Sequence, residues 1–148
     1  MSNQWQQAET HIAIAVYSIQ AARGFYEHKL GLSWVKEEVV QEQGVKLALL
    51  KAGSTNIELL EPLTEDSPVA KFLQKNGEGI HHLALGTSDL HTQMTSLKHT
   101  GISFVSNQPV SGANGTNIAF IPPNQTHGVL LELCEKQGFK RETENEML

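Results

Sequence analysis

The chain has 148 residues, of which 39% are apolar and 18% charged, a composition that suits a packed globular protein and excludes a disordered one. Eleven Lys and Arg residues against 16 Asp and Glu residues give a net charge of −5, which offers no general attraction to nucleic acid or to an anionic membrane. The single cysteine, Cys134, excludes an intrachain disulfide framework. Residues 1–10 contain no apolar signal segment, and no apolar run is long enough to span a membrane. We therefore expect a soluble, cytoplasmic protein.

The first half of the chain predicts one strand, one helix and three more strands. Apolar and β-branched residues predict a strand over His11–Tyr17. Ser18 is a typical helix N-cap, and apolar residues at helical spacing predict a helix from there to Gly31. Glycine-containing turns separate the three strands that follow, Ser33–Val40, Val45–Lys51 and Asn56–Leu60.

The second half repeats this order after a connector over residues 63–79. The connector predicts a short helix that is capped by Asp66 or Ser67, with Pro68 in its first turn. The elements predicted next are a strand over His81–Leu85, a helix from Ser88 or Asp89 to Gly101, and strands over Ile102–Val105, Asn117–Ile121 and Gly128–Cys134. A polar and charged tail follows from Lys136.

Two segments of the first half recur in the second. His11-Ile-Ala-Ile14 matches His82-Leu-Ala-Leu85 at an offset of 71 residues, and Ile57-Glu-Leu-Leu-Glu61 matches Leu131-Glu-Leu-Cys-Glu135 at an offset of 74. Two offsets that differ by three residues are what one loop insertion would produce. The sequence therefore predicts an α+β fold built from two tandem βαβββ modules.

Each module begins with a histidine whose strand face is otherwise lined by small residues. Because side chains alternate across a strand, His11 shares its face with Ala13 and Ala15, and His82 shares its face with Ala84. Small residues on one face leave volume for something other than protein. His81 is the ambiguous neighbour, and we choose His82 because its context repeats that of His11.

Each module ends with a glutamate, Glu58 or Glu132, between two apolar neighbours. Taken alone, a histidine in a strand is usually an ordinary hydrogen-bonded residue, and a glutamate in a strand usually faces water. A carboxylate among core residues is costly unless a cation or donors compensate it, and here both residue types recur together. We therefore predict a divalent metal site formed by His11, Glu58, His82 and Glu132. Four ligands on an octahedral ion leave two positions open, as a catalytic site requires.

These residues resemble the vicinal oxygen chelate (glyoxalase/bleomycin resistance/dioxygenase) superfamily, and within it the methylmalonyl-CoA epimerases. The segments that carry the likeness are Glu42-Gln-Gly-Val45, Ile57-Glu-Leu-Leu-Glu-Pro-Leu63, Asp66-Ser-Pro-Val-Ala-Lys-Phe-Leu73, Gly79-Ile-His-His-Leu83 and Gly128-Val-Leu-Leu-Glu-Leu133. The likeness covers about residues 9–136. We expect one domain there, with module 1 at about 9–63, a linker at 64–78, module 2 at about 79–136, and the tail at 137–148.

The resemblance implies a fold in which the modules pack side by side and form a curved sheet around a metal-containing cleft. It implies that His11, Glu58, His82 and Glu132 hold one divalent metal ion per chain, zinc or cobalt first, with nickel, manganese and iron also compatible. It further implies an acyl-CoA substrate and a homodimer. Some members have Gln where Glu58 stands, and in some a glutamate near the position of Leu47 has been proposed as the catalytic base.

Leu47 cannot transfer a proton, so we assign acid–base catalysis to Glu58 and Glu132. The expected reaction is the interconversion of the stereoisomers of methylmalonyl-CoA by removal of the α-proton through a metal-stabilised enolate. One alternative is a lactoylglutathione lyase, although the strand around Val16 lacks the arginine expected for grasping glutathione. Another is a protein of the same superfamily that binds a metal or small molecule without turnover. A ring-cleaving dioxygenase would need a three-ligand iron site, which Glu58 disfavours.

Overall fold

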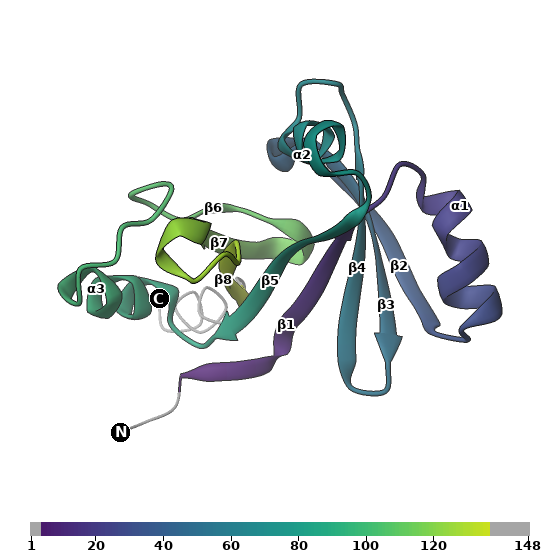
Figure 1. Cartoon of the computed structure of the whole chain (residues 1–148). Coiled ribbons are helices and arrows are strands. Elements are labelled where there is room, and N and C mark those ends of the chain that lie inside the picture. Colours follow the sequence, from purple (N-terminus) through teal and green to yellow (C-terminus); the bar gives the residue numbers. More distant parts are fainter. Residues whose placement is uncertain (1–3, 137–148) are drawn as a thin grey trace. The chain divides into compact units, whose positions relative to one another are not determined.

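A computed structural model describes residues 4–136 (Figure 1). The described chain divides into two compact units, one formed by residues 10–83 and the other by residues 4–9 together with 84–136. Strand β1 (Trp5–Ala15) and strand β5 (Gly79–Thr87) each contribute residues to both units. The order strand, helix, three strands occurs in each half of the chain, so the predicted α+β fold with a duplicated βαβββ pattern is confirmed.

The unit of residues 10–83 contains a mixed β-sheet, three helical segments and a 3₁₀ turn. Its elements are α1 (Ile19–Arg23), the π-helical segment η1 (Gly24–Lys29), β2 (Ser33–Val40), the 3₁₀ turn η2 (Gln41–Gln43), β3 (Val45–Ala52), β4 (Thr55–Pro62) and α2 (Pro68–Asn76). The hydrogen-bonded strand order is β2-β3-β4-β1. Strand β1 runs parallel to β4, whereas β3 runs antiparallel to both β2 and β4.

Side-chain caps start the two helices of this unit where the sequence predicts them. The amide of Ala21 donates to Ser18 Oγ at 3.1 Å, and that of Ala70 donates to Ser67 Oγ at 3.2 Å. Helix α1 lies on one face of the strands, where the buried Ile19 packs with Leu50 (Figure 1). The opposite face of β1 and β4 therefore stays open to other groups.

The unit of residues 4–9 and 84–136 packs one helix against an antiparallel sheet. Its elements besides β1 and β5 are α3 (Leu90–His99), β6 (Val110–Ser111), η3 (Ala113–Gly115), β7 (Thr116–Ile121), η4 (Pro123–Gln125) and β8 (Leu131–Lys136), with strand order β8-β7-β6. Asp89 caps α3 by accepting from the amide of Thr92 at 3.1 Å. Leu90 and Met94 of this helix form a buried cluster with Leu133. No helix within residues 4–136 is long and apolar enough to cross a membrane.

The second glutamate of each repeated segment performs the same task in its own unit. Glu61 Oε1 accepts a hydrogen bond from the amide of Ile19 at 2.8 Å, and Glu135 Oε1 accepts one from the amide of Leu90 at 2.7 Å. These amides belong to the first residues of α1 and α3, whose N–H groups have no partner within the helix. The carboxylates also lie at the positive end of the helix dipole.

Several sequence predictions need correction. The first strand runs from Trp5 to Ala15, so it begins before His11 and ends before Tyr17. The strand predicted over Ile102–Val105 is absent; instead Gln125 uses its amide group to bond both the N–H and the C=O of Ser103, at 2.8 and 2.7 Å. The short β6 pairs with β7 in its place. The last strand begins at Leu131 rather than at Gly128. The predicted tail over 137–148 lies outside the described residues.

Candidate metal site

His11 lies on β1 with the surroundings that the alternation of its strand predicts. His11 is 8% exposed, and Ala13 and Ala15 on the same strand face are fully buried. Parallel pairing places Ala13 beside Glu58 of β4. Because alanine has almost no side chain, the carboxylate of Glu58 has room to approach His11. The distance from His11 Nε2 to Glu58 Oε1 is 3.3 Å.

His82 lies on β5 in the same unit as His11 and Glu58. The His11 and His82 rings are edge to face, with centroids 5.5 Å apart. Burial lowers the pKa of His82 well below its ordinary value, and the positive charge that His11 and His81 would carry lowers it further. His82 is therefore neutral at physiological pH, and the neutral imidazole is the form that binds metal.

His81, which the sequence left as an alternative to His82, is half-buried on the same strand. Its Nδ1 lies 2.9 Å from Nδ1 of His82. Desolvation lowers the pKa of His81 as well. The structure thus gives the two neighbouring histidines a direct contact that strand alternation alone would not predict.

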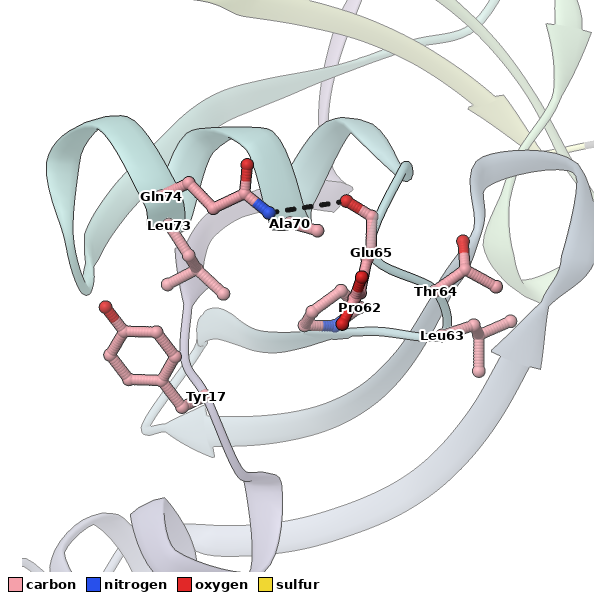
Figure 2. Close-up of a pocket in the computed structure, with 8 residues that line it drawn as sticks. All are labelled: Tyr17, Pro62, Leu63, Thr64, Glu65, Ala70, Leu73 and Gln74. Atoms are coloured by element: carbon pink, nitrogen blue, oxygen red, sulfur yellow. Dashed lines mark hydrogen bonds between the residues drawn. The ribbon is translucent and has the colours of Figure 1, made fainter.

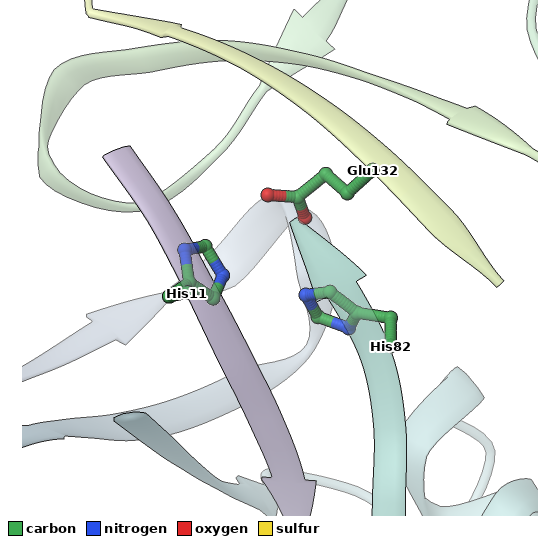
Figure 3. A group of neighbouring side chains, drawn as sticks. All are labelled: His11, His82 and Glu132. Atoms are coloured by element: carbon green, nitrogen blue, oxygen red, sulfur yellow. The ribbon is translucent and has the colours of Figure 1, made fainter. Parts of the chain in front are cut away.

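Glu132 belongs to the other unit, where it lies on β8 opposite Phe120 of β7. The residue is 6% exposed, and a carboxylate buried among apolar groups is costly unless a cation or donors compensate it. His11, His82 and Glu132 are all buried, and each offers one nitrogen or oxygen atom of a kind that binds metal ions (Figure 3).

The donor set fits a divalent metal ion. Imidazole nitrogen and carboxylate oxygen are ligands for zinc and for the other first-row divalent metals. Within the unit of residues 10–83, His11 and Glu58 already have their donor atoms 3.3 Å apart, and His82 is held neutral beside them.

Leu47 lies on the same sheet face as Glu58. In the antiparallel pairing of β3 with β4, Leu49 is directly opposite Glu58, and Leu47 is two residues along the strand from Leu49. Residues two apart share a face, so the side chains of Leu47 and Glu58 are diagonal neighbours. Leu47 is 3% exposed. An apolar side chain therefore occupies the position for which the family resemblance implied a base.

A pocket of about 310 Å³ lies in the same unit, beyond the C-terminal ends of β1 and β4 (Figure 2). Its lining residues are Tyr17, Pro62, Leu63, Thr64, Glu65, Ala70, Leu73 and Gln74. Pro62 shares a strand face with Glu58, four residues earlier, which corresponds to roughly 14 Å along the strand. Sequence reasoning missed this pocket, because it forms only when the connector and α2 fold back over the strand ends.

The comparisons with known proteins agree with this fold. Residues 10–120 match a model of the glyoxalase/bleomycin resistance protein/dioxygenase superfamily. The chain is 50% identical over 128 residues to the uncharacterized protein YqjC of Bacillus subtilis, covering 86% of this chain and 91% of that protein. It is 37% identical over 124 residues to the mitochondrial methylmalonyl-CoA epimerase of Homo sapiens, covering 83% of this chain and 70% of that protein.

A solved structure gives the same likeness in three dimensions. A variant of Streptomyces coelicolor methylmalonyl-CoA epimerase, in complex with 2-nitronate-propionyl-CoA, superposes with a TM-score of 0.82 at 39% identity. The match covers 86% of this chain and 96% of that chain. The vicinal oxygen chelate fold implied by the sequence is thereby confirmed.

Proposed function

Because the chain belongs to the glyoxalase/bleomycin resistance protein/dioxygenase superfamily, we propose that it is a metal-dependent epimerase that interconverts the stereoisomers of methylmalonyl-CoA. Relatives and structural neighbours that are methylmalonyl-CoA epimerases support this assignment. The observation that carries it is the placement of His11, Glu58 and His82 together on one sheet face, with small residues around them.

The proposed ligands are His11, Glu58, His82 and Glu132, with zinc or cobalt as the expected metal. A divalent cation held there would supply the positive charge that stabilises the enolate oxygen, an effect worth several kcal/mol. The α-proton of a malonyl thioester lies between two carbonyl groups, so a carboxylate can remove it. Inversion requires a proton donor or acceptor on each side of the planar α-carbon. We assign these two roles to Glu58 and Glu132.

The experiment that tests the proposal combines metal analysis with α-proton exchange. The purified protein is assayed for bound metal by elemental analysis, and for deuterium uptake at the α-carbon of methylmalonyl-CoA in D₂O, before and after chelation. We expect exchange that chelation abolishes and metal restores. Metal-loaded protein that binds methylmalonyl-CoA without exchanging its α-proton would contradict an epimerase and indicate a binding protein. Turnover of the hemithioacetal of methylglyoxal and glutathione would instead indicate a lactoylglutathione lyase.

The pocket at the end of β4 is suited to the pantetheine arm of the CoA thioester. Its walls include apolar side chains such as Leu73 and the exposed ring of Tyr17. The Thr64 hydroxyl donates to Asp66 and the Gln74 amide nitrogen donates to the Glu65 carbonyl, so the side-chain oxygens of Thr64 and Gln74 would accept from the amides of the arm. An extended arm that starts at Glu58 and follows the strand would reach Pro62, which lies on the same face.

Tyr17→Ala tests this placement with a truncated substrate. We expect about a tenfold loss in kcat/KM for methylmalonyl-CoA, mainly through a higher KM, as removal of roughly 1.4 kcal/mol of binding would give. The N-acetylcysteamine thioester lacks most of the arm and should be unaffected. Phe25→Ala, which removes an exposed aromatic ring outside the pocket, is the matched control. Equal losses for both substrates would contradict the placement.

We also propose that the protein is a homodimer, as the sequence resemblance implies, and that it is cytoplasmic, as its composition led us to expect. Light scattering coupled to gel filtration should give about twice the 16.3 kDa of one chain. A mass of one chain would contradict the dimer without affecting the proposed reaction.

A further inference from the structure

The two neighbouring histidines on β5 contact each other through their Nδ1 atoms. Nδ1 of His81 lies 2.9 Å from Nδ1 of His82, and the ring centroids are 5.1 Å apart at an interplanar angle of 79°. At this distance one nitrogen must carry the proton and the other must accept it, because two bare nitrogens or two N–H groups would repel each other.

The ring nitrogen that carries the proton in each histidine decides which ring donates the hydrogen bond. A neutral imidazole has one N–H, and a ring that binds metal through Nε2 keeps its proton on Nδ1. Nε2 of His82 is buried on the side of the ring away from its Nδ1 contact. If Nε2 of His82 is the ligand atom, its Nδ1–H must donate to His81, and His81 must then carry its own proton on Nε2.

His81 is itself held in place by the connector helix. The ring of Phe72, on α2, packs edge to face against the His81 ring with centroids 5.0 Å apart. Helix α2 is fixed by its cap at Ser67 and by the burial of Leu73. The acceptor atom is therefore supported by packing, as a group that orients a metal ligand must be.

We propose that His81 is a positioning residue, which accepts a hydrogen bond from Nδ1–H of His82 and so directs Nε2 of His82 toward the metal ion. This inference rests on the proposed metal site. Outer-shell partners of this kind typically contribute a factor of about 10–100 to metal affinity. His81 thus contributes to the site without binding the metal itself.

Two substitutions of His81 separate this role from simple packing. His81→Leu removes the acceptor but keeps an apolar body against Phe72, whereas His81→Asn retains an acceptor oxygen close to the position of Nδ1. Zinc affinity is measured by competition with a chromophoric chelator. We expect His81→Leu to weaken zinc binding about 10–100-fold and His81→Asn to recover most of the loss. His91→Leu, which replaces an exposed histidine on α3, is the control and should bind zinc as the wild type does.

The tautomer of His82 gives a second readout that needs neither activity nor metal. Long-range ¹H–¹⁵N correlation spectra of the wild type, with and without zinc, should show the proton of His82 on Nδ1. A proton on Nε2 of His82 would overturn the proposal, as would a His81→Leu variant that folds and binds zinc within threefold of the wild type. Wild-type protein with the expected tautomer but no affinity for divalent metals would contradict the proposed function while leaving the hydrogen bond from His82 to His81 established.

Discussion

At the scale of single residues, the chemistry of the site depends on small neighbours as much as on ligands. Ala13 pairs with Glu58 in the parallel ladder, and its short side chain lets the carboxylate reach His11. A larger residue at position 13 would fill this space. Leu47 of β3 lies on the same sheet face as Glu58 but cannot ionise. Glu58 is therefore the ionisable group of β3 and β4 nearest to His11.

Replacing either proposed catalytic glutamate should remove epimerisation while the fold survives. We expect Glu58→Gln and Glu132→Gln each to lower kcat at least ~100-fold, because an amide cannot remove a proton. Initial rates with methylmalonyl-CoA provide the measurement, and circular dichroism verifies folding. Full activity of both metal-loaded variants would exclude these roles.

Position 47 offers a rescue that distinguishes acid–base catalysis from metal binding. In the Glu58→Gln background, the additional change Leu47→Glu places a carboxylate diagonally across from position 58. We expect the double variant to regain at least ~10-fold of the lost rate, as a positioned base would supply. If its metal content matches that of Glu58→Gln and its rate stays equally low, a base at position 47 does not serve this site.

A surface cluster makes a separate pH-dependent contribution to stability. The Arg23 side chain donates a hydrogen bond to Glu27, which holds the pKa of Glu27 below its ordinary value of 4.5, and the Arg23 guanidinium lies 4.1 Å from the centroid of the Trp34 ring. A carboxyl group whose pKa is lowered by folding stabilises the protein above pH 4.5, and this contribution is lost as the pH falls through the lowered value.

Urea unfolding of Glu27→Gln and of the wild type should therefore differ slightly at pH 7 and converge as the pH falls through the lowered pKa of Glu27. The difference is expected to be small because exposed ion pairs contribute little. A difference that grows toward acid pH would contradict the assigned cause.

At the scale of elements, the repeated Glu-x-x-Glu segment serves both faces of a strand. Residues three apart on a strand point to opposite faces, so Glu58 faces the site while Glu61 faces the helix it caps. Glu132 and Glu135 divide the same way on β8, where Glu135 caps α3. One short segment thus connects the strand face that carries a proposed metal ligand to the helix on the other face.

The caps can be tested by their effect on stability. Glu61→Leu removes the acceptor for the Ile19 amide and should lower the free energy of unfolding by about 1.5–3 kcal/mol, the range for hydrogen bonds to charged groups. Glu61→Gln keeps an acceptor and should recover about half. Chemical denaturation provides both values. Equal losses for the two variants would indicate that charge alone, rather than the hydrogen bond, stabilises the start of α1.

At the scale of the whole molecule, the proposed metal ligands come from β1, β4, β5 and β8, which are far apart in the sequence. A ligand that binds only the folded chain stabilises it by about 2.7 kcal/mol when its free concentration is 100 times Kd. For a chain of this length, that corresponds to a rise in Tm of roughly 5–10 °C.

We therefore expect chelation to lower Tm by this amount and zinc or cobalt to restore it, as measured by scanning calorimetry. The His82→Leu variant lacks a ligand and should show little response to either treatment. A wild-type Tm that is independent of chelator and metal would contradict a bound ion.

The element order, the helix caps and the candidate ligands could all be predicted from the amino-acid sequence. Strand alternation, N-cap residues and a duplicated His and Glu pattern are local signals, and local signals suffice where neighbours in the chain decide the structure. They misplaced the strand over Ile102–Val105 because a side chain distant in the sequence, that of Gln125, bonds the backbone there.

Four features could not be predicted before the chain was folded: the 3.3 Å approach of Glu58 to His11, the contact between His81 and His82, the capping by Glu61 and Glu135, and the pocket beneath α2. Each of these depends on the register of paired strands or on a connector folding back. Register and long-range packing are set by the summed burial of many side chains, which no short segment of sequence contains.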